Sequence, residues 1–397
     1  MKKFLAVILA LTMVMALVAC GGGSSSTGSG DSGTTTTTQP ATSGGSTATT
    51  PAASGDALRV AMITDYGDIT DQSFNQTTYE ACKAWASDNG ADFTYFKPAS
   101  DSDDDRISMI DKAVDEGYDI VVMPGFAFVA AAEATAPEYP DVTFIAIDVD
   151  AGDFSAGYTI PSNLYCCVYQ EELCGYMAGY ATVAMGYTKL GVLGGMAVPA
   201  VVRYCYGFVQ GADAAAAALS KDVTITYGYA NQFYGDADIT AAMDTWYANG
   251  IEAVFACGGG IYTSVAEAAA KVDGKVVGVD VDQSGIIDGL QNKPGMTLTS
   301  AMKGLAVATQ GKLDEVKNGS FKGGISENLG LVSANPEENY VGIPLESTQW
   351  SADFTQDDYK SMVADMFSGK LTVSNDITAQ PENFAHTISL TNVGNVK

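Results

Sequence analysis

Short apolar runs that resemble buried strands alternate with helix-like stretches along most of this chain, and this alternation restricts the fold more than any other feature. Strands are predicted at residues 58–63, 119–123, 143–147, 189–196, 223–229, 252–256, 276–280 and 296–300. Helices are predicted between them, at residues 101–117, 129–136, 171–185, 204–219 and 237–249. Strands that are apolar throughout need cover on both faces, and helices between parallel strands supply it. The pattern therefore predicts an α/β fold.

The series of strands and helices starts again near residue 189, so the sequence predicts two successive α/β lobes of similar size. We place the first lobe at residues 56–165 and most of the second at residues 166–330, with hinge crossings between them. Residues 331–397 are expected to pack back on the lobes. Parallel sheets bind ligands at the carboxyl ends of their strands, so we expect a ligand cleft between the lobes.

The loop that follows the first strand carries the strongest candidate binding residues. Residues 64–76 connect a strand to a helix and therefore lie at the carboxyl end of a strand. Asp65 and Asn75 supply hydrogen-bonding groups, and Phe74 supplies a flat apolar ring. An aromatic ring beside carboxylates and amides suits a small, planar, polar ligand.

A structural role explains the same loop equally well at the level of sequence. Asp71 or Ser73 can cap the helix that begins here, with Gln76 completing a capping box from Ser73. Phe74 can be a core residue. The loop alone does not decide between binding and capping.

The N-terminal residues have the features of a secretion signal. A short positive start precedes an almost wholly apolar run at residues 4–18, and a run of about fifteen residues is shorter than a membrane-spanning helix requires. The pattern resembles a lipobox, which implies a lipoprotein signal peptide at residues 1–20 and a lipid anchor on Cys20. Residues 21–55, rich in Gly, Ser and Thr, are predicted to be a disordered linker. We expect a lipid-anchored protein on the extracytoplasmic face of a cell membrane.

Charge and composition exclude several classes of function. Lys and Arg number 20 against 47 Asp and Glu, a net charge of -27, which disfavours a nucleic-acid partner. The only histidine, His386, lies in the C-terminal segment, so a nucleophile activated by histidine has no obvious base. The acidic run at residues 101–105 lacks the glycine and distal glutamate of a calcium loop, and we interpret it as a solvated helix start. No cofactor or metal is predicted.

The cysteines that follow Cys20 lack the CxxC spacing of a metal site and are expected to be buried thiols. A disulfide among them is left open because an extracytoplasmic compartment permits one. They are Cys82, Cys166, Cys167, Cys174, Cys205 and Cys257.

Short motifs follow one another in a specific order over nearly all of the chain after the linker. They are DQSFNQ at residues 71–76, PGF at 124–126, FIAID at 144–148, EELCGYMAG at 171–179, GGM at 194–196, CGGG at 257–260, GVDVDQ at 278–283 and SAMK at 300–303. Together they resemble the basic membrane protein family of substrate-binding lipoproteins for ABC importers, which includes purine-nucleoside-binding members. The resemblance implies a periplasmic-binding-protein fold, in which two lobes joined by a hinge close on a ligand and deliver it to a permease.

The resemblance also implies roles for residues of the first lobe. Phe74 corresponds to the aromatic residue that stacks on the nucleoside base. Asp65, Asn75 and Asp148 match positions that hydrogen-bond the edge of the base, and carboxylates accept such bonds well. Asp148 follows a strand directly, so the alternative is that it caps the next helix.

In the second lobe, the resemblance implies that Asp280 takes the ribose hydroxyls and that Lys303 lies nearby. The turn at Gly258 and Gly259 lets the backbone approach the sugar closely. The alternatives are a helix cap for Asp280 and a surface ion pair for Lys303. Candidates for a second aromatic residue opposite Phe74 are Phe233, Phe255, Trp246 and Tyr262, although Phe255 also fits the core of its strand.

The sequence departs from the family pattern at three positions. Gln72 stands where a lysine is usual, Asp68 stands in place of a glycine, and the bulky Ile261 occupies the last glycine position of the second-lobe turn. The last change affects the expected contact with the sugar.

The sequence as a whole predicts a membrane-anchored solute-binding protein that captures a small ligand, a purine nucleoside by resemblance, for an ABC permease. It predicts no enzymatic activity. The alternatives are a surface sensor or adhesin with the same fold and a nucleoside hydrolase that uses carboxylates.

Overall fold

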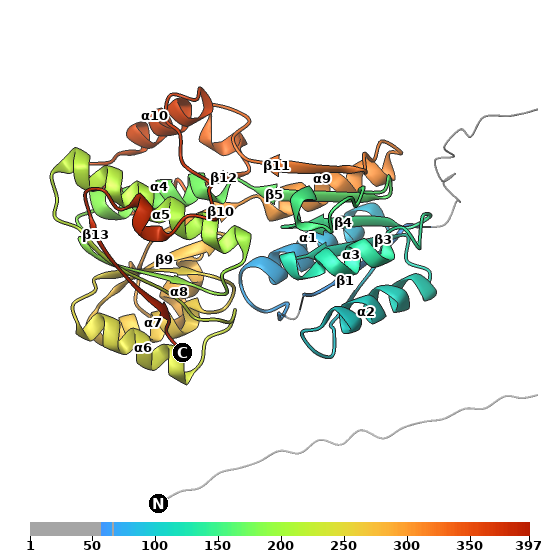
Figure 1. The fold of residues 1–397 in the computed structure, drawn as a ribbon, viewed down its shortest axis with the longest axis horizontal. Coiled ribbons are helices and arrows are strands. Elements are labelled where there is room, and N and C mark those ends of the chain that lie inside the picture. Colours follow the sequence, from blue (N-terminus) through green and yellow to red (C-terminus); the bar gives the residue numbers. More distant parts are fainter. Residues whose placement is uncertain (1–56, 66) are drawn as a thin grey trace, which may run out of the picture. The chain divides into compact units, whose positions relative to one another are not determined.

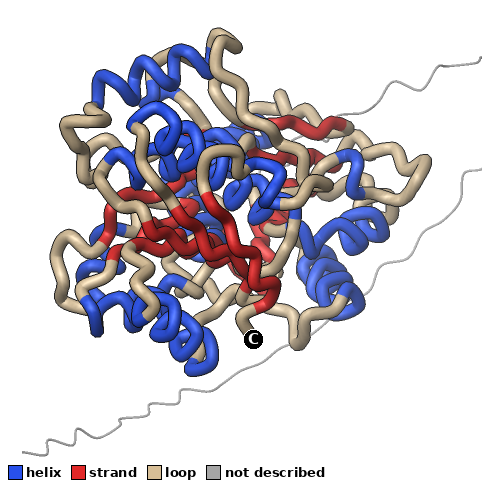
Figure 2. The backbone as a smooth tube through the Cα atoms, turned by 60° about the vertical axis from the view of Figure 1, so that its left-hand side comes forward, coloured by secondary structure: helices blue, strands red, loops and turns tan. Residues whose placement is uncertain are grey.

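The computed structural model describes residues 57–65 and 67–397. The predicted signal peptide, Cys20 and the linker lie outside the described residues. In the described part, strands form two sheets covered by helices, as Figures 1 and 2 show. The predicted α/β class is therefore confirmed.

The first sheet contains six parallel strands in the order β11-β5-β4-β3-β1-β2. Its strands are β1 (Arg59–Ile63), β2 (Asp92–Phe96), β3 (Ile120–Pro124), β4 (Thr143–Ile147), β5 (Leu164–Tyr169) and β11 (Ile325–Leu329). Its helices are α1 (Phe74–Asn89), α2 (Asp103–Asp115), α3 (Val129–Thr135) and α9 (Leu305–Lys317). We call this sheet with its helices the first lobe.

The second sheet contains seven strands in the order β12-β10-β9-β8-β6-β7-β13, parallel except for β12. Its strands are β6 (Lys189–Gly194), β7 (Thr224–Tyr229), β8 (Ala253–Cys257), β9 (Lys275–Asp280), β10 (Thr297–Lys303), β12 (Val341–Gly342) and β13 (Ser389–Asn395). Its helices are α4 (Glu171–Ala184), α5 (Pro199–Leu219), α6 (Ala237–Ala248), α7 (Tyr262–Val272), α8 (Ser284–Leu290) and α10 (Gln356–Phe367). We call this sheet with its helices the second lobe.

Short 3-10 helices complete the described elements, at Phe126–Phe128, Ala151–Asp153, Pro336–Glu338 and Pro381–Phe384. Strands β2 and β11 are absent from the sequence prediction because both are partly exposed edge strands without a continuous apolar run. The central strand β3 is buried along its whole length, as a parallel strand covered on both faces must be.

The chain passes between the lobes at three places: after β5, after β10, and between β11 and β12. The lobe boundary expected after residue 165 falls inside β5, which belongs entirely to the first sheet. The C-terminal segment adds β12 and β13 to the second sheet. Asp213 of α5 fixes this segment by accepting the backbone N–H groups of His386, Thr387 and Ile388 at 2.8, 2.6 and 3.1 Å.

Helices α4 and α5 lie unusually close together. A side chain on Gly179 would place its Cβ 2.1 Å from the carbonyl oxygen of Phe208, and one on Gly211 would lie 2.0 Å from that of Tyr176. Gly175 and Gly207 make equally close contacts across the same pair of helices. Only glycine permits this approach of two backbones. The first turn of α4 is thereby brought beside α5.

Helix α5 starts at Pro199, before residue 204 where the sequence pattern places its start. Proline at the first helical position costs no hydrogen bond, because that N–H has no partner within the helix. The earlier start places Arg203 on the helix.

The contact between α4 and α5 yields a stability prediction. Gly179→Ala should lower the free energy of unfolding by about 1–3 kcal/mol, because the methyl group meets backbone that cannot move away. Gly311→Ala is the matched control, since Gly311 lies inside α9 with open space around its Cα. That change should raise the free energy of unfolding by about 0.5–1 kcal/mol through helix propensity. Urea unfolding followed by circular dichroism measures both; equal effects would contradict the close-contact argument.

Candidate functional site

Three predicted site residues lie at carboxyl ends of strands. Asp148 follows β4 of the first sheet, whereas Asp280 ends β9 and Lys303 ends β10 of the second sheet. Both aspartates have a left-handed backbone, with φ of 61° and 65°. Non-glycine residues rarely adopt this conformation, and such residues cluster at functional sites.

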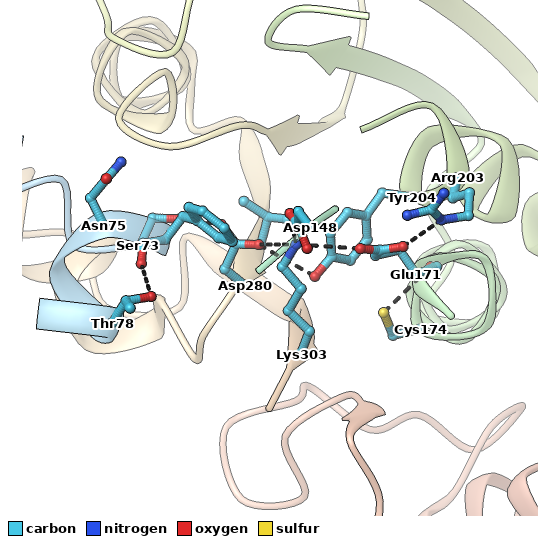
Figure 3. A network of polar contacts seen from close by, with 12 residues as sticks. Ser73, Asn75, Thr78, Asp148, Glu171, Cys174, Arg203, Tyr204, Asp280 and Lys303 are labelled. Carbon is cyan, nitrogen blue, oxygen red and sulfur yellow. Dashed lines mark hydrogen bonds and ion pairs between the residues drawn. The ribbon is translucent and has the colours of Figure 1, made fainter. Parts of the chain in front are cut away.

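The ammonium group of Lys303 joins these strand ends (Figure 3). Its Nζ lies 2.6 Å from Asp148 Oδ2, 3.3 Å from Glu171 Oε1 and 4.0 Å from Asp280 Oδ1. The Lys303 side chain is only 2% exposed. Burial alone would lower the pKa of Lys303, but the three carboxylates together raise it above its usual value, so the group stays charged. Lys303 is thus a buried ion-pair partner and not a surface one.

Glu171 begins α4 and is fully buried. Its Oε2 accepts a hydrogen bond from Arg203 Nε at 2.6 Å, while its Oε1 faces Lys303. Burial raises the pKa of Glu171, and Arg203 and Lys303 oppose that shift. The close packing of α4 on α5 allows this arrangement.

The loop after β1 caps a helix and contacts the other lobe. Asp71 caps α1: its Oδ1 accepts the N–H groups of Ser73 and Gln76 at 2.9 and 3.0 Å, and its Oδ2 accepts that of Asn75 at 3.0 Å. The Ser73 side chain makes no capping bond. Its Oγ instead donates to Asp280 Oδ2 of the other lobe at 2.6 Å. Asp71 therefore leaves Ser73 available for a contact between lobes.

Aromatic rings surround the Lys303 ammonium. Its Nζ lies 4.7 Å from the ring centre of Phe74, 5.3 Å from that of Tyr169 and 5.5 Å from that of Tyr204. A cation at these distances is attracted to the ring faces. Phe74 is partly buried and packs against the core, as the core interpretation of this residue expects.

Asp65, in the loop after β1, and Asn75, in the first turn of α1, lie close together. A side chain on Gly67 would come within 2.4 Å of Asn75 Nδ2 and 3.0 Å of Asp65 Oδ1, so both flank that glycine. Arg106 of α2 holds the loop by donating to the backbone oxygen of Asp65 at 3.2 Å. Asn75 is buried, and its Oδ1 has no hydrogen-bond partner among the described residues.

The turn at Gly258 and Gly259 has positive φ at both residues, 155° and 48°. A side chain on Gly259 would lie 2.8 Å from the backbone oxygen of Phe233, and one on Gly258 would lie 3.0 Å from the Phe233 ring. Phe233 therefore covers this turn. The other three candidate aromatics are core residues: Phe255, Trp246 and Tyr262.

Ile261 does not obstruct the turn. Its side chain is fully buried in the core of the second lobe, and its φ of -63° does not require glycine. The departure from the family pattern at this position is absorbed by core packing.

The acidic run at residues 101–105 starts α2. Ser102 Oγ accepts the N–H of Asp105 at 3.2 Å, and the buried Arg106 pairs with Asp101 and Asp103. In the described part of the chain, no group of three or more His, Cys, Asp or Glu side chains is arranged to hold a metal ion. The six cysteines described are free and buried.

Sequence reasoning missed Ser73 as a donor between lobes, and it missed Glu171, Arg203, Tyr169 and Tyr204. One signal was present for Glu171, since charged residues open a helix that is otherwise apolar. The other residues reach the site only through long-range packing. The helices described here lack the combination of length and apolar character needed to cross a membrane.

The amino-acid sequence is similar to known substrate-binding proteins and lipoproteins. Residues 58–365 match the model of the Bmp family, described as ABC transporter substrate-binding protein PnrA-like. The chain is 27% identical over 333 residues to the ABC transporter nucleoside-binding protein BmpA of Lactococcus lactis subsp. cremoris, covering 80% of this chain and 89% of that protein. It is 26% identical over 316 residues to an uncharacterised lipoprotein of Pyrococcus horikoshii, covering 76% of this chain and 73% of that protein.

Among solved structures, an ABC transporter solute-binding protein from Aeropyrum pernix K1 has a similar fold. The TM-score is 0.62 at 22% identity, and the match covers 83% of this chain and 90% of that chain. The predicted two-lobed solute-binding fold is therefore confirmed, as is the family resemblance of the sequence motifs.

Glu172, next to Glu171, is a second buried carboxyl group. Its side chain is almost fully buried, and its Oε2 has no hydrogen-bond partner among the described residues. Burial, reinforced by the nearby charge of Glu171, raises its pKa to about 7. An ionised Glu172 therefore opposes folding.

This shift predicts a pH-dependent effect of Glu172→Gln. The folded pKa of about 7 lies above the ordinary value of 4.5, so wild type loses stability as pH rises between those values. Glutamine cannot ionise and escapes this loss, so the variant should gain up to about 3 kcal/mol relative to wild type between pH 4.5 and pH 8. Urea unfolding at both pH values measures the gain, with Glu138→Gln as the surface control. A constant difference between variant and wild type would contradict the burial argument.

Proposed function

The chain belongs to the Bmp family of PnrA-like ABC transporter substrate-binding proteins, and from this premise we propose that it captures a purine nucleoside between its lobes for an ABC permease. The observation that carries the proposal is the meeting of strand-end residues from both lobes around the Lys303 ammonium, which lies beside the Phe74 ring. Asp148 belongs to the first lobe, and Asp280 and Lys303 belong to the second. A ligand held there touches both lobes at once.

The first lobe binds the base in this proposal. Phe74 supplies a ring on which a purine stacks, and such stacking contributes about 1–3 kcal/mol per base. Asp65, Asn75 and Asp148 supply oxygen acceptors for the N–H groups of the base. Asn75 Oδ1 and Asp148 Oδ1 support this role, because both are buried without a hydrogen-bond partner among the described residues. A buried acceptor without a partner gains most from a ligand donor.

The second lobe binds the sugar. Asp280 accepts from the ribose hydroxyls, and Lys303 lies within ion-pair distance of it. Gly258 and Gly259 allow the backbone to approach the sugar in this proposal. Phe233 lies against this turn, which supports it among the four candidates for the aromatic residue opposite Phe74. A ligand that binds both lobes favours the closed form by its differential affinity, so binding closes the hinge.

Membership in a family of substrate-binding proteins favours binding of the ligand without its chemical conversion. The proposal therefore expects a nucleoside to be released intact, whereas a carboxylate hydrolase would release free base. Chromatography of the ligand after overnight incubation with the full chain separates these two functions. Delivery of the bound ligand to a permease is expected of an importer component and not of a sensor or adhesin, so a permease-dependent uptake assay separates these functions.

The proposed site makes a binding prediction. Phe74→Ala and Asp280→Asn should each weaken the binding of inosine or guanosine by about tenfold or more, since each removes a direct contact. Isothermal titration calorimetry on the full chain measures the affinity. The matched controls are Tyr95→Ala, an exposed aromatic on β2, and Asp282→Asn, an exposed aspartate beside the site. Unchanged affinity in both site variants would contradict the assignment.

The proposed location makes a second prediction. Cys20→Ser should move the protein from the membrane fraction to the soluble extracytoplasmic fraction, because the acylated thiol is the proposed anchor. Immunoblots of cell fractions measure the change, and Cys82→Ser serves as the cysteine control. Retention of Cys20→Ser in the membrane fraction would argue against lipid anchoring at this residue.

A further inference from the structure

Lys303 and Glu171 lie at two of the three places where the chain passes between the lobes. Lys303 is the last residue of β10, and the chain then enters α9 of the first lobe. Glu171 is the first residue of α4, directly after the chain leaves β5. The 3.3 Å contact between Nζ of Lys303 and Oε1 of Glu171 therefore joins two crossings.

The third crossing is attached to the same point. Gly304, which follows Lys303, donates its N–H to the backbone oxygen of Tyr340 at 2.7 Å. Tyr340 in turn donates to Gly330 at 3.0 Å, and both residues lie between β11 and β12. Lys303 thus lies where the three crossings between the lobes are connected.

The carboxylate partners of Lys303 divide between the lobes. Glu171 and Asp280 belong to the second lobe with Lys303 itself, while Asp148 belongs to the first. A hinge movement that separates the lobes takes Asp148 away and leaves the other two in place. The contact with Asp148 is also the shortest of the three, at 2.6 Å.

Arg203 binds the Glu171 carboxylate through the oxygen that does not contact Lys303, and so holds Glu171 in a fixed orientation. Its Nε binds one carboxylate oxygen at 2.6 Å, which leaves the other oxygen facing Lys303. The Glu171 side chain is fully buried and has no alternative contact with water. Removal of the Glu171 charge would take the carboxylate partner from the largely buried Arg203 and one of three carboxylates from the buried Lys303, which is unfavourable.

We propose that Lys303 is an interlobe latch, which closes the protein on itself through Asp148 without a ligand, and that Glu171 is the positioning residue that holds the Lys303 ammonium at the hinge. The ion pairs of the protein then favour the closed form before a nucleoside binds. The apparent affinity for the nucleoside depends on the populations of the open and closed forms. The inference rests on the hinge movement of the proposed function but not on the identity of the ligand.

The experiment measures the distance between the lobes in the full chain without ligand. Fluorophores are attached through non-canonical amino acids at Glu138 of the first lobe and Ala248 of the second, both exposed. Single-molecule energy transfer then gives the populations of closed and open forms. Lys303→Met should lower the ratio of closed to open molecules by about tenfold. Glu171→Gln should lower it in the same direction, and should add nothing in a Lys303→Met background.

The matched control is Lys312→Met. Lys312 is also largely buried and also contacts two carboxylates, Glu315 at 3.0 Å and Glu327 at 3.2 Å, but all three residues belong to the first lobe. Its replacement should leave the ratio of closed to open molecules at the wild-type value. Ser73→Glu is the reference for opening, because it places a second carboxylate beside Asp280. Circular dichroism verifies that each variant is folded.

The outcomes separate the latch from the hinge. If Ser73→Glu opens the protein and Lys303→Met does not, the latch is overturned and the hinge stands. If Lys312→Met opens it as much as Lys303→Met, the effect is general destabilisation and the latch is again overturned. If no variant changes the distance, the hinge of the proposed function and the latch both fail. An additive effect of Glu171→Gln and Lys303→Met would overturn the positioning role alone.

Discussion

The buried ammonium of Lys303 is the interaction on which the geometry of the candidate site depends. A charged group that is 2% exposed must be compensated by partners, and here they are Asp148, Glu171 and Asp280. Because Asp148 belongs to the other lobe, compensation of this charge is complete only while the lobes are together. The charge of one side chain is thus paired with carboxylates from both lobes.

That arrangement depends in turn on contacts between backbones. Glycines on α4 and α5 let the helices approach until a carbonyl oxygen occupies the place of a side chain, as at Gly179 and Gly211. The approach brings Arg203 to Glu171, which then faces Lys303. The close packing of α4 on α5 therefore sets the position of the Glu171 carboxylate that faces Lys303.

The loop after β1 shows how one short sequence serves two purposes. Asp71 accepts the free N–H groups of α1, so Ser73 is released to bind Asp280. In the folded protein, neighbouring residues thus divide the capping of α1 and the contact with the second lobe.

The sequence by itself determined the α/β class, because continuous apolar strands leave few alternatives, and it pointed to the strand-end residues Asp148 and Asp280. Tertiary structure alone decided which side chains meet there. Ser73 and Asp280 are 207 residues apart in the chain, and Arg203 and Glu171 are 32 apart. Local sequence patterns do not show which residues so far apart in the chain come into contact, because these contacts follow from how the lobes and helices pack.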